Sequence, residues 1–382
     1  MQLIDHHCHS VVRDDLDDAV FASLLTESDR DPTPGTSPWD SALGLAVRRW
    51  CPPVLDLDPY APAADYLARR RELGPVESTR RLLRAARLDA CFLDTGLDTA
   101  GGATLLAPAE FAEASGAAVR EVVRLEYVAE RASVGGDPKR WADDVLAALT
   151  EAVHTRGAVA VKSVLAYRHG LDIDPARPGP AEVARAAAEH LAAPSRLEHP
   201  VRLEHPVLLR HLLWTAVDLG LPIQLHTGFG DPDLTLHRAD PSLLTGFIRA
   251  CEPYGVPLVL LHCWPYHRQA AWLAQSFPHV HCDVGLMLSY VGTGARRVLA
   301  ETLELAPFGK VLFSTDAYGL PELYVVGAAA FRDAVDSWAG DLRATGCPPA
   351  DTDRFAALIG ADNAARLYNH PAASRSTGVG GG

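Results

Sequence analysis

The strongest constraint on the fold of this chain is a regular alternation of short apolar runs with helix-like segments. Eight runs rich in Val, Ile, Leu and Phe recur along the sequence, and most are followed by a polar residue and turn formers. They lie at 2–7, 89–96, 120–128, 157–166, 221–228, 256–264, 279–287 and 309–317. Segments with helical periodicity, such as 206–220 and 265–277, separate most neighbours. This alternation is typical of a parallel sheet whose strands are connected by helices.

The number of runs favours one architecture of the α/β class. Eight strands close a (β/α)₈ TIM barrel, and continuous apolar runs such as PLVLL suit a sheet buried on both faces. An open, doubly wound sheet is the alternative that the same pattern leaves open. We expect a single barrel domain over residues 1–370, with a long insertion at about 10–88 after the first strand, and a disordered tail at 371–382.

The insertion contains a Pro-rich patch at 31–40 and a helix-like stretch at 64–74. In a barrel, a loop that follows the carboxyl end of a strand lies over the active-site mouth. We therefore expect the insertion to cover this mouth, or to join a neighbouring subunit in a homo-oligomer.

Composition excludes several classes of partner. Hydrophobic residues make up 48% of the 382 residues, so the chain can bury a sizeable core. The net charge of −13 and the absence of a basic block argue against nucleic acid and anionic membranes. No apolar stretch approaches the ~18 residues of a membrane span, and the first ten residues are unlike a signal peptide. We expect a cytoplasmic protein that acts on a small molecule.

Polar side chains at strand ends are the candidates for chemistry, because functional groups in a parallel barrel gather at the carboxyl ends of the strands. The residues that meet this test are His7, His9, Lys162, His226, His262 and Asp316. The second His-x-His pair, His279 and His281, instead opens the seventh run and should lie at the opposite rim.

These residues predict a metal centre. Period-2 alternation places His7 and His9 on one face of their strand, as two ligands of one metal require. Four imidazoles and a carboxylate would bury too many polar groups together unless a cation organised them. Imidazole nitrogen and carboxylate oxygen suit Zn²⁺, our default, and also Mn²⁺, Ni²⁺ or Fe²⁺. The site could hold one or two ions.

Lys162 leaves two alternatives open. Its ammonium would be repelled by a cation, whereas addition of CO₂ to the amine would give a carbamate that bridges two metals. In the other interpretation it is a lysine with a lowered pKa, or one paired with a substrate carboxylate. Glu126, at the end of the third run, is a competing bridge or a substrate contact.

Candidate substrate contacts follow the ligand positions. Arg168 could clamp a substrate carboxylate, or it could be a solvated loop arginine. Trp264 and Tyr318, together with Phe229 and Tyr266, could form the walls of the pocket or simply pack at the barrel mouth.

The order and strand placement of these residues carry a family resemblance. Asp5-x-His7-x-His9, followed by the lysine, the two single histidines and the final aspartate, resembles the amidohydrolase superfamily of metal-dependent (β/α)₈ enzymes. GADNAARLYN (360–369) resembles the segment that often ends such domains. VKSVLAYRHGL (161–171), QLHTGFGDPD (224–233) and FSTDAYGLPELY (313–324) are similar to the amidohydrolase-related (amidohydrolase 2) branch, found alone or ahead of glutamine-synthetase-like domains in nodulin-like proteins.

The resemblance implies a role for each position. His7 and His9 would bind one metal, His226 and His262 a second metal or the substrate, and carboxylated Lys162 would bridge the two. Asp316 would contact the first metal and act as general base and acid toward a metal-activated hydroxide, with His262 as the other catalytic residue. In many relatives only one metal is present and the lysine is absent.

The expected activity is therefore that of a metal-dependent amidohydrolase, which cleaves a C–N, amide-type bond of a small molecule. The fusion of relatives to glutamine-synthetase-like domains suggests a γ-glutamyl amide or a similar nitrogenous substrate. The alternative is a mononuclear, metal-dependent decarboxylase, a lyase acting on a small carboxylic acid. A third hypothesis, a binding module without turnover, is weakened because all the expected polar positions are filled.

Overall fold

The computed structural model describes residues 1–134, 136–192 and 201–371, so nearly all of the expected tail at 371–382 lies outside the described residues. Its main sheet has seven parallel strands, whose spatial order follows the order of the chain. The strands are β1 (Ile4–Cys8), β2 (Ala90–Asp94), β5 (Ala118–Arg124), β6 (Ala160–Ser163), β7 (Ile223–Thr227), β8 (Leu258–His262) and β9 (Val280–Cys282). A separate hairpin joins β3 (Thr99–Ala100) to β4 (Ala103–Thr104).

The last β run of the sequence closes the ring without forming a regular strand. The Leu312 N–H donates to the Cys282 carbonyl at 3.0 Å, and the His6 N–H of β1 donates to the Phe313 carbonyl at 3.2 Å. Asp316 then takes a left-handed conformation, with φ at 50°, which ends the extended backbone. The predicted (β/α)₈ barrel is confirmed. The open-sheet alternative is wrong, because its strand order would reverse at a switch point.

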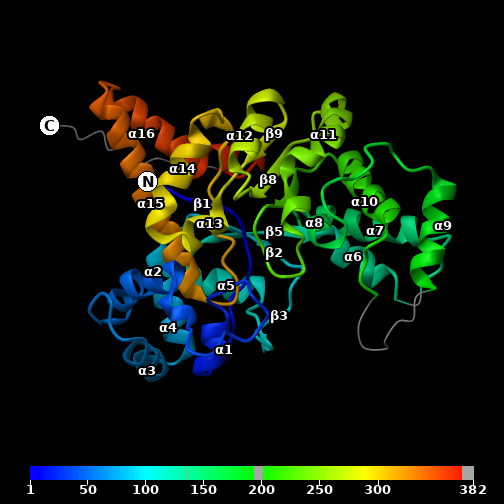
Figure 1. The fold of residues 1–382 in the computed structure, drawn as a ribbon. Coiled ribbons are helices and arrows are strands. Elements are labelled where there is room, and N and C mark those ends of the chain that lie inside the picture. Colours follow the sequence, from blue (N-terminus) through cyan, green and yellow to red (C-terminus); the bar gives the residue numbers. More distant parts are fainter. Residues whose placement is uncertain (135, 193–200, 372–382) are drawn as a thin grey trace.

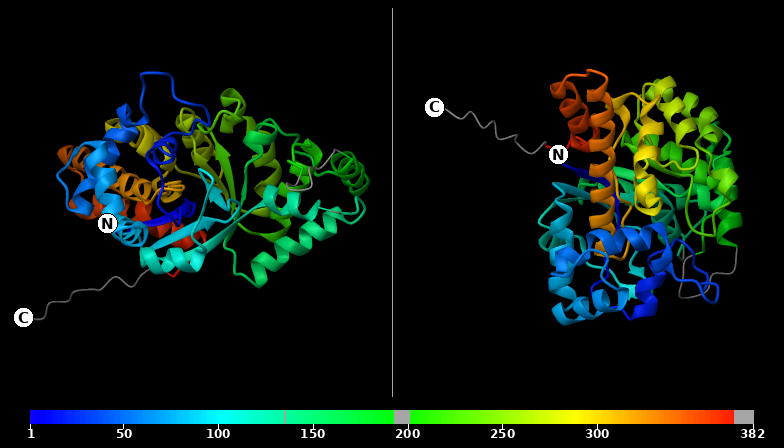
Figure 2. Two further views of the ribbon diagram at one scale, coloured as in Figure 1. Left: turned by 90° about the horizontal axis from the view of Figure 1, so that it is seen from below. Right: turned by 60° about the vertical axis from the view of Figure 1, so that its left-hand side comes forward.

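Helices cover the outside of the sheet (Figures 1 and 2). Those after β4 are α5 (Pro108–Ser115), α6 (Leu125–Ala132), α7 (Trp141–His154), α8 (Leu165–Arg168), α9 (Pro180–Leu191), α10 (Pro206–Leu219), α11 (Thr245–Cys251), α12 (His267–Ser276), α13 (Gly285–Tyr290), α14 (Ala295–Leu303), α15 (Pro321–Ala344), α16 (Pro349–Ala357) and α17 (Asn363–Leu367). Several begin with Pro in the first turn, where its missing N–H costs no helical hydrogen bond. None of these described helices, nor those of the insertion, is long and apolar enough to cross a membrane.

Three of the predicted strands are longer at their carboxyl ends than the strands of the structure. The third run ends at Arg124, and its continuation opens α6, in which Leu125 and Ala129 bury one helical face. The fourth and seventh runs likewise pass into the short helices α8 and α13. Helical spacing of apolar residues overrides the β-like composition at these points. Glu126 consequently lies in the first turn of a helix and does not end a strand.

The insertion is helical, with α1 (Asp18–Ser23), α2 (Ala42–Trp50), α3 (Ala63–Leu73) and α4 (Pro75–Ala86). Helices α2 and α4 pack against the long helix α15, and Figure 1 shows the blue insertion helices grouped beside its lower end. The predicted helix-like stretch at 64–74 coincides with α3.

A buried ion pair fastens the insertion to the barrel. The Arg70 guanidinium of α3 donates through Nε to Glu322 Oε1 at 2.8 Å, and the Tyr66 hydroxyl donates to the same oxygen at 2.8 Å. Arg70 is 4% exposed and Glu322 is fully buried in the first turn of α15. Removal of one partner would leave the other charge buried without compensation, which is the costly case for an ion pair.

We predict that Arg70→Met lowers the free energy of unfolding by about 3–5 kcal/mol, because it leaves the buried Glu322 carboxylate without a cationic partner. The matched control is Arg268→Met, which removes an exposed guanidinium from its pairs with Glu304 and Glu301 and should cost much less. Urea denaturation followed by circular dichroism measures both. An Arg70→Met protein as stable as the control would contradict the proposed role of the buried pair.

Candidate metal centre

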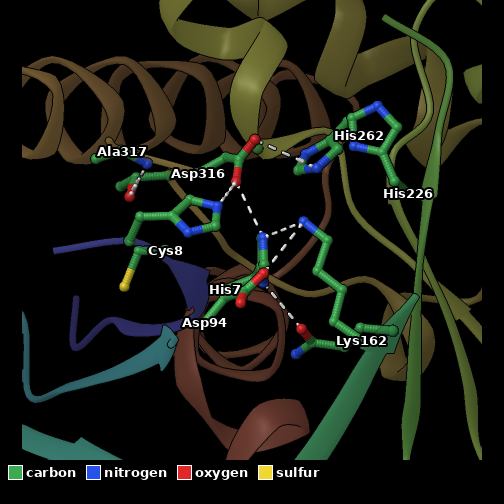
Figure 3. A network of polar contacts seen from close by, with 12 residues as sticks. His7, Cys8, Asp94, Lys162, His226, His262, Asp316 and Ala317 are labelled. Atoms are coloured by element: carbon green, nitrogen blue, oxygen red, sulfur yellow. Dashed lines mark hydrogen bonds and ion pairs between the residues drawn. The ribbon is translucent and has the colours of Figure 1, made fainter. Parts of the chain in front are cut away.

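The six predicted site residues meet at the carboxyl ends of the strands, with His9 directly after β1. His7 lies near the end of β1, Lys162 in β6, His226 in β7 and His262 at the end of β8, while Asp316 follows the closing segment. Figure 3 shows these side chains pointing toward one another from separate strands. The parallel arrangement explains this convergence, because it brings the carboxyl ends of all strands to one rim.

Asp316 is the centre of the cluster. Its Oδ1 lies 3.0 Å from His7 Nε2 and 3.3 Å from His9 Nε2, while its Oδ2 lies 3.3 Å from His262 Nε2. Although burial alone would raise the pKa of this carboxyl, the three neighbouring imidazoles hold it well below its usual range. Asp316 is therefore a carboxylate at neutral pH.

The orientation of His7 leaves a lone pair facing the cluster. Gln224 donates through its amide nitrogen to the His6 carbonyl at 2.7 Å and to the Tyr368 hydroxyl at 3.0 Å, so its oxygen faces His7. His7 Nδ1 then donates to Gln224 Oε1 at 2.9 Å, and Nε2 carries no proton. Burial, and then the charge of Lys162, lower the pKa of His7 to about 3, so the ring is neutral at pH 7.

The donor set fits a divalent cation. Two acceptors, His7 Nε2 and Asp316 Oδ1, face each other at 3.0 Å, an arrangement that needs a positive charge between them. Both ring nitrogens of His262 and Nδ1 of His9 are buried without hydrogen-bond partners. Among the described residues, two groups of ligand atoms lie within 4.8 Å of one another, His7–His262–Asp316 and His7–His9–Asp94.

Lys162 reaches into the same cluster. Its amine lies 2.8 Å from His7 Nε2 and 3.9 Å from Asp94 Oδ2. Burial lowers the pKa of this amine, which favours its neutral form. In the amine form it occupies the lone pair of His7 that a metal would need.

Asp94 and Arg124 form a part of the site that the sequence analysis missed. The Arg124 guanidinium donates to Asp94 Oδ2 through Nε at 3.1 Å and Nη2 at 2.8 Å. Burial would raise the pKa of Asp94, but the charge of Arg124 lowers it below its usual range. Asp94 is the last residue of β2, so the strand-end test applied to the other residues would also have selected it.

A second missed carboxylate holds His262 in place. Asp283 accepts from the His262 N–H at 2.8 Å through Oδ1 and from His6 Nε2 at 2.8 Å through Oδ2. Burial opposes ionisation of Asp283, yet the hydrogen bond from His6 and its charge lower the pKa to about 2. His262 has a φ of 67°, which is rare for a residue with a side chain, and this hydrogen bond stabilises the conformation.

The other candidates lie around this centre. His226 donates through Nε2 to the Phe229 carbonyl at 3.0 Å, and its ring centre lies 4.7 Å from that of His262. Tyr318 stacks edge-on against His9. Trp264 packs edge-to-face against the Phe229 ring.

Two predicted substrate contacts already have protein partners. Glu126 Oε1 accepts from the Ser163 hydroxyl at 2.6 Å, and its other oxygen is buried without a partner. Arg168 pairs with Glu130 at 3.0 Å. At the opposite, amino-terminal end of β9, His279 donates through Nε2 to the Ile248 carbonyl at 3.1 Å.

Comparison with known families agrees with this geometry. The sequence pattern of the amidohydrolase family matches residues 4–370. The chain belongs to the amidohydrolase family. The resemblance stated from the motifs is thereby confirmed, and a dependence on a divalent metal accords with the ligand cluster.

Relatives of the family extend the comparison. The chain is 32% identical over 200 residues to Protein fluG of Emericella nidulans, a match that covers 50% of this chain and 23% of that much longer protein. A Lactobacillus casei ATCC 334 structure, described by name as a metal-dependent hydrolase without a stated substrate, is 27% identical with a TM-score of 0.85 over 96% of this chain and 95% of that one. A uronate isomerase of Bacillus halodurans C-125, 14% identical with a TM-score of 0.62 over 97% and 93% of the two chains, shares the fold.

We predict that Gln224→Met weakens metal binding by about 10- to 100-fold, because His7 loses the acceptor that fixes its tautomer and ring orientation. The control is Thr227→Val on the same strand. Within the described residues, the Thr227 hydroxyl bonds only to Leu261 and Cys263. Competition with a chromophoric chelator measures the affinity. Equal affinities for the two variants would contradict the assigned role of Gln224.

Proposed function

We propose that this chain is a metal-dependent hydrolase that cleaves a C–N, amide-type bond in a small molecule. The main support for this proposal is the Asp316 carboxylate. Its two oxygens lie 3.0–3.3 Å from three imidazoles at the barrel mouth. A carboxylate in that position can exchange a proton with water and with a leaving group beside it. A cytoplasmic location and a homo-oligomeric state stay predictions.

His7, His9, His262 and Asp316 would hold the cation, for which zinc is our default. When bound, it would polarise a carbonyl and lower the pKa of a water molecule to about 7. Asp316 would accept the proton of the attacking water and return it to the leaving nitrogen. His262, fixed by Asp283, would orient the Asp316 oxygen that carries the proton.

The two arginines around the site are both paired with carboxylates of the chain. Arg168, the predicted clamp for a substrate carboxylate, is paired with Glu130. The nearer guanidinium, that of Arg124, is paired with buried Asp94. A substrate carboxylate, whether of an aromatic acid or of a γ-glutamyl group, would therefore have to bind elsewhere or displace one of these ion pairs.

Product analysis tests the reaction class. Metal-loaded protein should release an amine or ammonia from a panel of γ-glutamyl amides and cyclic amides. Release of CO₂ from aromatic acids, with no amide consumed, would replace the hydrolase with the lyase alternative.

We predict that Asp316→Asn lowers kcat/KM for any amide found in this way by about 10²- to 10⁴-fold, because the amide side chain cannot accept the proton. The control is Asp353→Asn, whose carboxylate is 72% exposed and pairs with Arg343 away from the site. Circular dichroism should show both variants folded. Activity of the Asp316 variant within a few-fold of wild type would rule out the proposed base.

Lys162 determines the number of metal ions in this proposal. As an amine it donates to His7 Nε2, the nitrogen that a metal would need, and as an ammonium it would also repel a second cation. Addition of CO₂ to the neutral amine, with loss of one proton, would give an anionic carbamate that could bridge two ions. The lowered pKa of Lys162 favours the neutral amine that reacts. We propose the carboxylated form when bicarbonate is present.

We predict about two metal equivalents per chain after loading with bicarbonate, because the carbamate supplies the bridging charge. Lys162→Ala should bind about one equivalent and lose most activity, with partial rescue by a short carboxylic acid. Elemental analysis and ¹³C NMR of protein loaded with labelled bicarbonate measure the two properties. One metal equivalent per chain in the wild type, without a carbamate signal, would contradict the proposal of two metal ions.

A further inference from the structure

A cavity of about 1080 Å³ lies between the insertion and the barrel mouth. Residues from 19 to 43 form its roof, and Asp316 lies in its wall, so it opens onto the metal centre. Tyr290 of α13 and Tyr318 flank the same space. Any substrate that reaches Asp316 through this cavity contacts the insertion as well as the barrel.

The lining of the cavity is strongly acidic. Its acidic residues are Glu27, Asp29, Asp31, Asp231, Asp233 and Asp316. Among the described lining residues, Arg30 is the only lysine or arginine, and it pairs with Asp29 at 3.1 Å. Asp233 pairs with Arg202 from outside the cavity at 2.7 Å. Glu27 and Asp231 have no such cationic partner among the described residues.

A hydrogen bond from the barrel fixes the Glu27 carboxylate of the roof. Its Oε1 accepts from the Tyr290 hydroxyl at 2.9 Å. Burial and then the charge of Asp316 raise the pKa of Glu27 to about 7, and burial raises that of Asp231. The charges of Lys162 and Arg202 oppose these shifts only in part, and neither group forms an ion pair with Glu27 or Asp231 in the described chain.

Ser289 adds a buried polar group beside this cavity. It lines the same cavity, it is 3% exposed, and its hydroxyl has no hydrogen-bond partner in the described chain. Buried hydroxyls are normally hydrogen-bonded. A hydroxyl oxygen can accept from an N–H group, as a carboxylate can.

We propose that this cavity binds a cationic amine group of the substrate, with Glu27 as its counter-charge. An ammonium has three N–H donors and no acceptor, which matches a wall of carboxylate and hydroxyl oxygens. The rings of Tyr290 and Tyr318 add aromatic faces that attract a cation. The inference rests on the proposed function in one respect, that the amine belongs to the amide substrate of the same site.

Calorimetric titration tests the binding without turnover. Metal-loaded protein is titrated at constant ionic strength with butylammonium chloride, with 1-butanol and with sodium butyrate. We expect saturable binding of butylammonium alone, and an increase of its Kd of at least about tenfold in Glu27→Gln, because a charge-assisted hydrogen bond is lost. The matched control is Asp40→Asn, an exposed carboxylate of the insertion outside the cavity, which should bind as wild type.

A second variant separates charge from structure. Tyr290→Phe removes the hydrogen bond to Glu27 and keeps the carboxylate, so it should bind butylammonium within a few-fold of wild type, with melting temperatures checking the fold of all variants. Butylammonium binding that is absent, or that is unchanged in Glu27→Gln, would overturn the inference, as would preferential binding of butyrate.

Paired substrates distinguish this inference from the proposed function. Two amides that differ only in a terminal ammonium or methyl group are compared by kcat/KM in wild type and in Glu27→Gln. We expect wild type to prefer the ammonium substrate and the variant to lose that preference. Turnover without preference and without butylammonium binding would overturn the cavity assignment alone. Binding that depends on Glu27 without hydrolysis of any amide would overturn the hydrolase and leave the amine site in place.

Discussion

The hydrogen bonds that close the barrel also position the carboxylate at its mouth. The Asp316 N–H donates to the His7 carbonyl at 3.1 Å, and the His9 N–H donates to the Ala317 carbonyl at 2.8 Å. The backbone that carries two of the histidines is thus bonded to the backbone that carries the carboxylate. Asp316 can hold its left-handed conformation because contacts on both sides determine it. Fold closure and ligand geometry therefore depend on the same few bonds.

The fold and the main ligands could be predicted from sequence because strand ends are local features. An apolar run that ends in His or Asp identifies both the strand and the rim where that side chain lies, as for His262. Gln224 carries no such signal, because an amide inside a buried strand acquires its role only from His7 on another strand. Glu27 lies in a part of the insertion where the sequence analysis found no periodic pattern, so only the packed structure shows that it faces the mouth. Glu126 was misplaced because its run changes from strand to helix without a Gly or Pro.

The two buried carboxylates at the rim differ in what neutralises them. Asp94 is bonded to the guanidinium of Arg124, a permanent charge supplied by the chain. Asp316 faces His7 and His262, whose burial favours the neutral imidazole, so a cation from outside the chain would complete its charge balance. A second cation beside Asp94 would also meet Arg124 and Lys162. One cation at Asp316 would thus be the lower-energy state, unless Lys162 became an anion.

The roof of the cavity is held at two points that belong to the barrel. The Glu27 carboxylate is bonded to Tyr290 on α13, which follows β9. The rest of the insertion is bonded through Arg70 to Glu322, six residues after Asp316 at the start of α15. The distance between the acidic roof and the Asp316 carboxylate is therefore set by elements of the barrel. The roof of the cavity is therefore preorganised, because the barrel fixes it at both points. A substrate of the right length and charge would bind without the entropic cost of ordering the insertion.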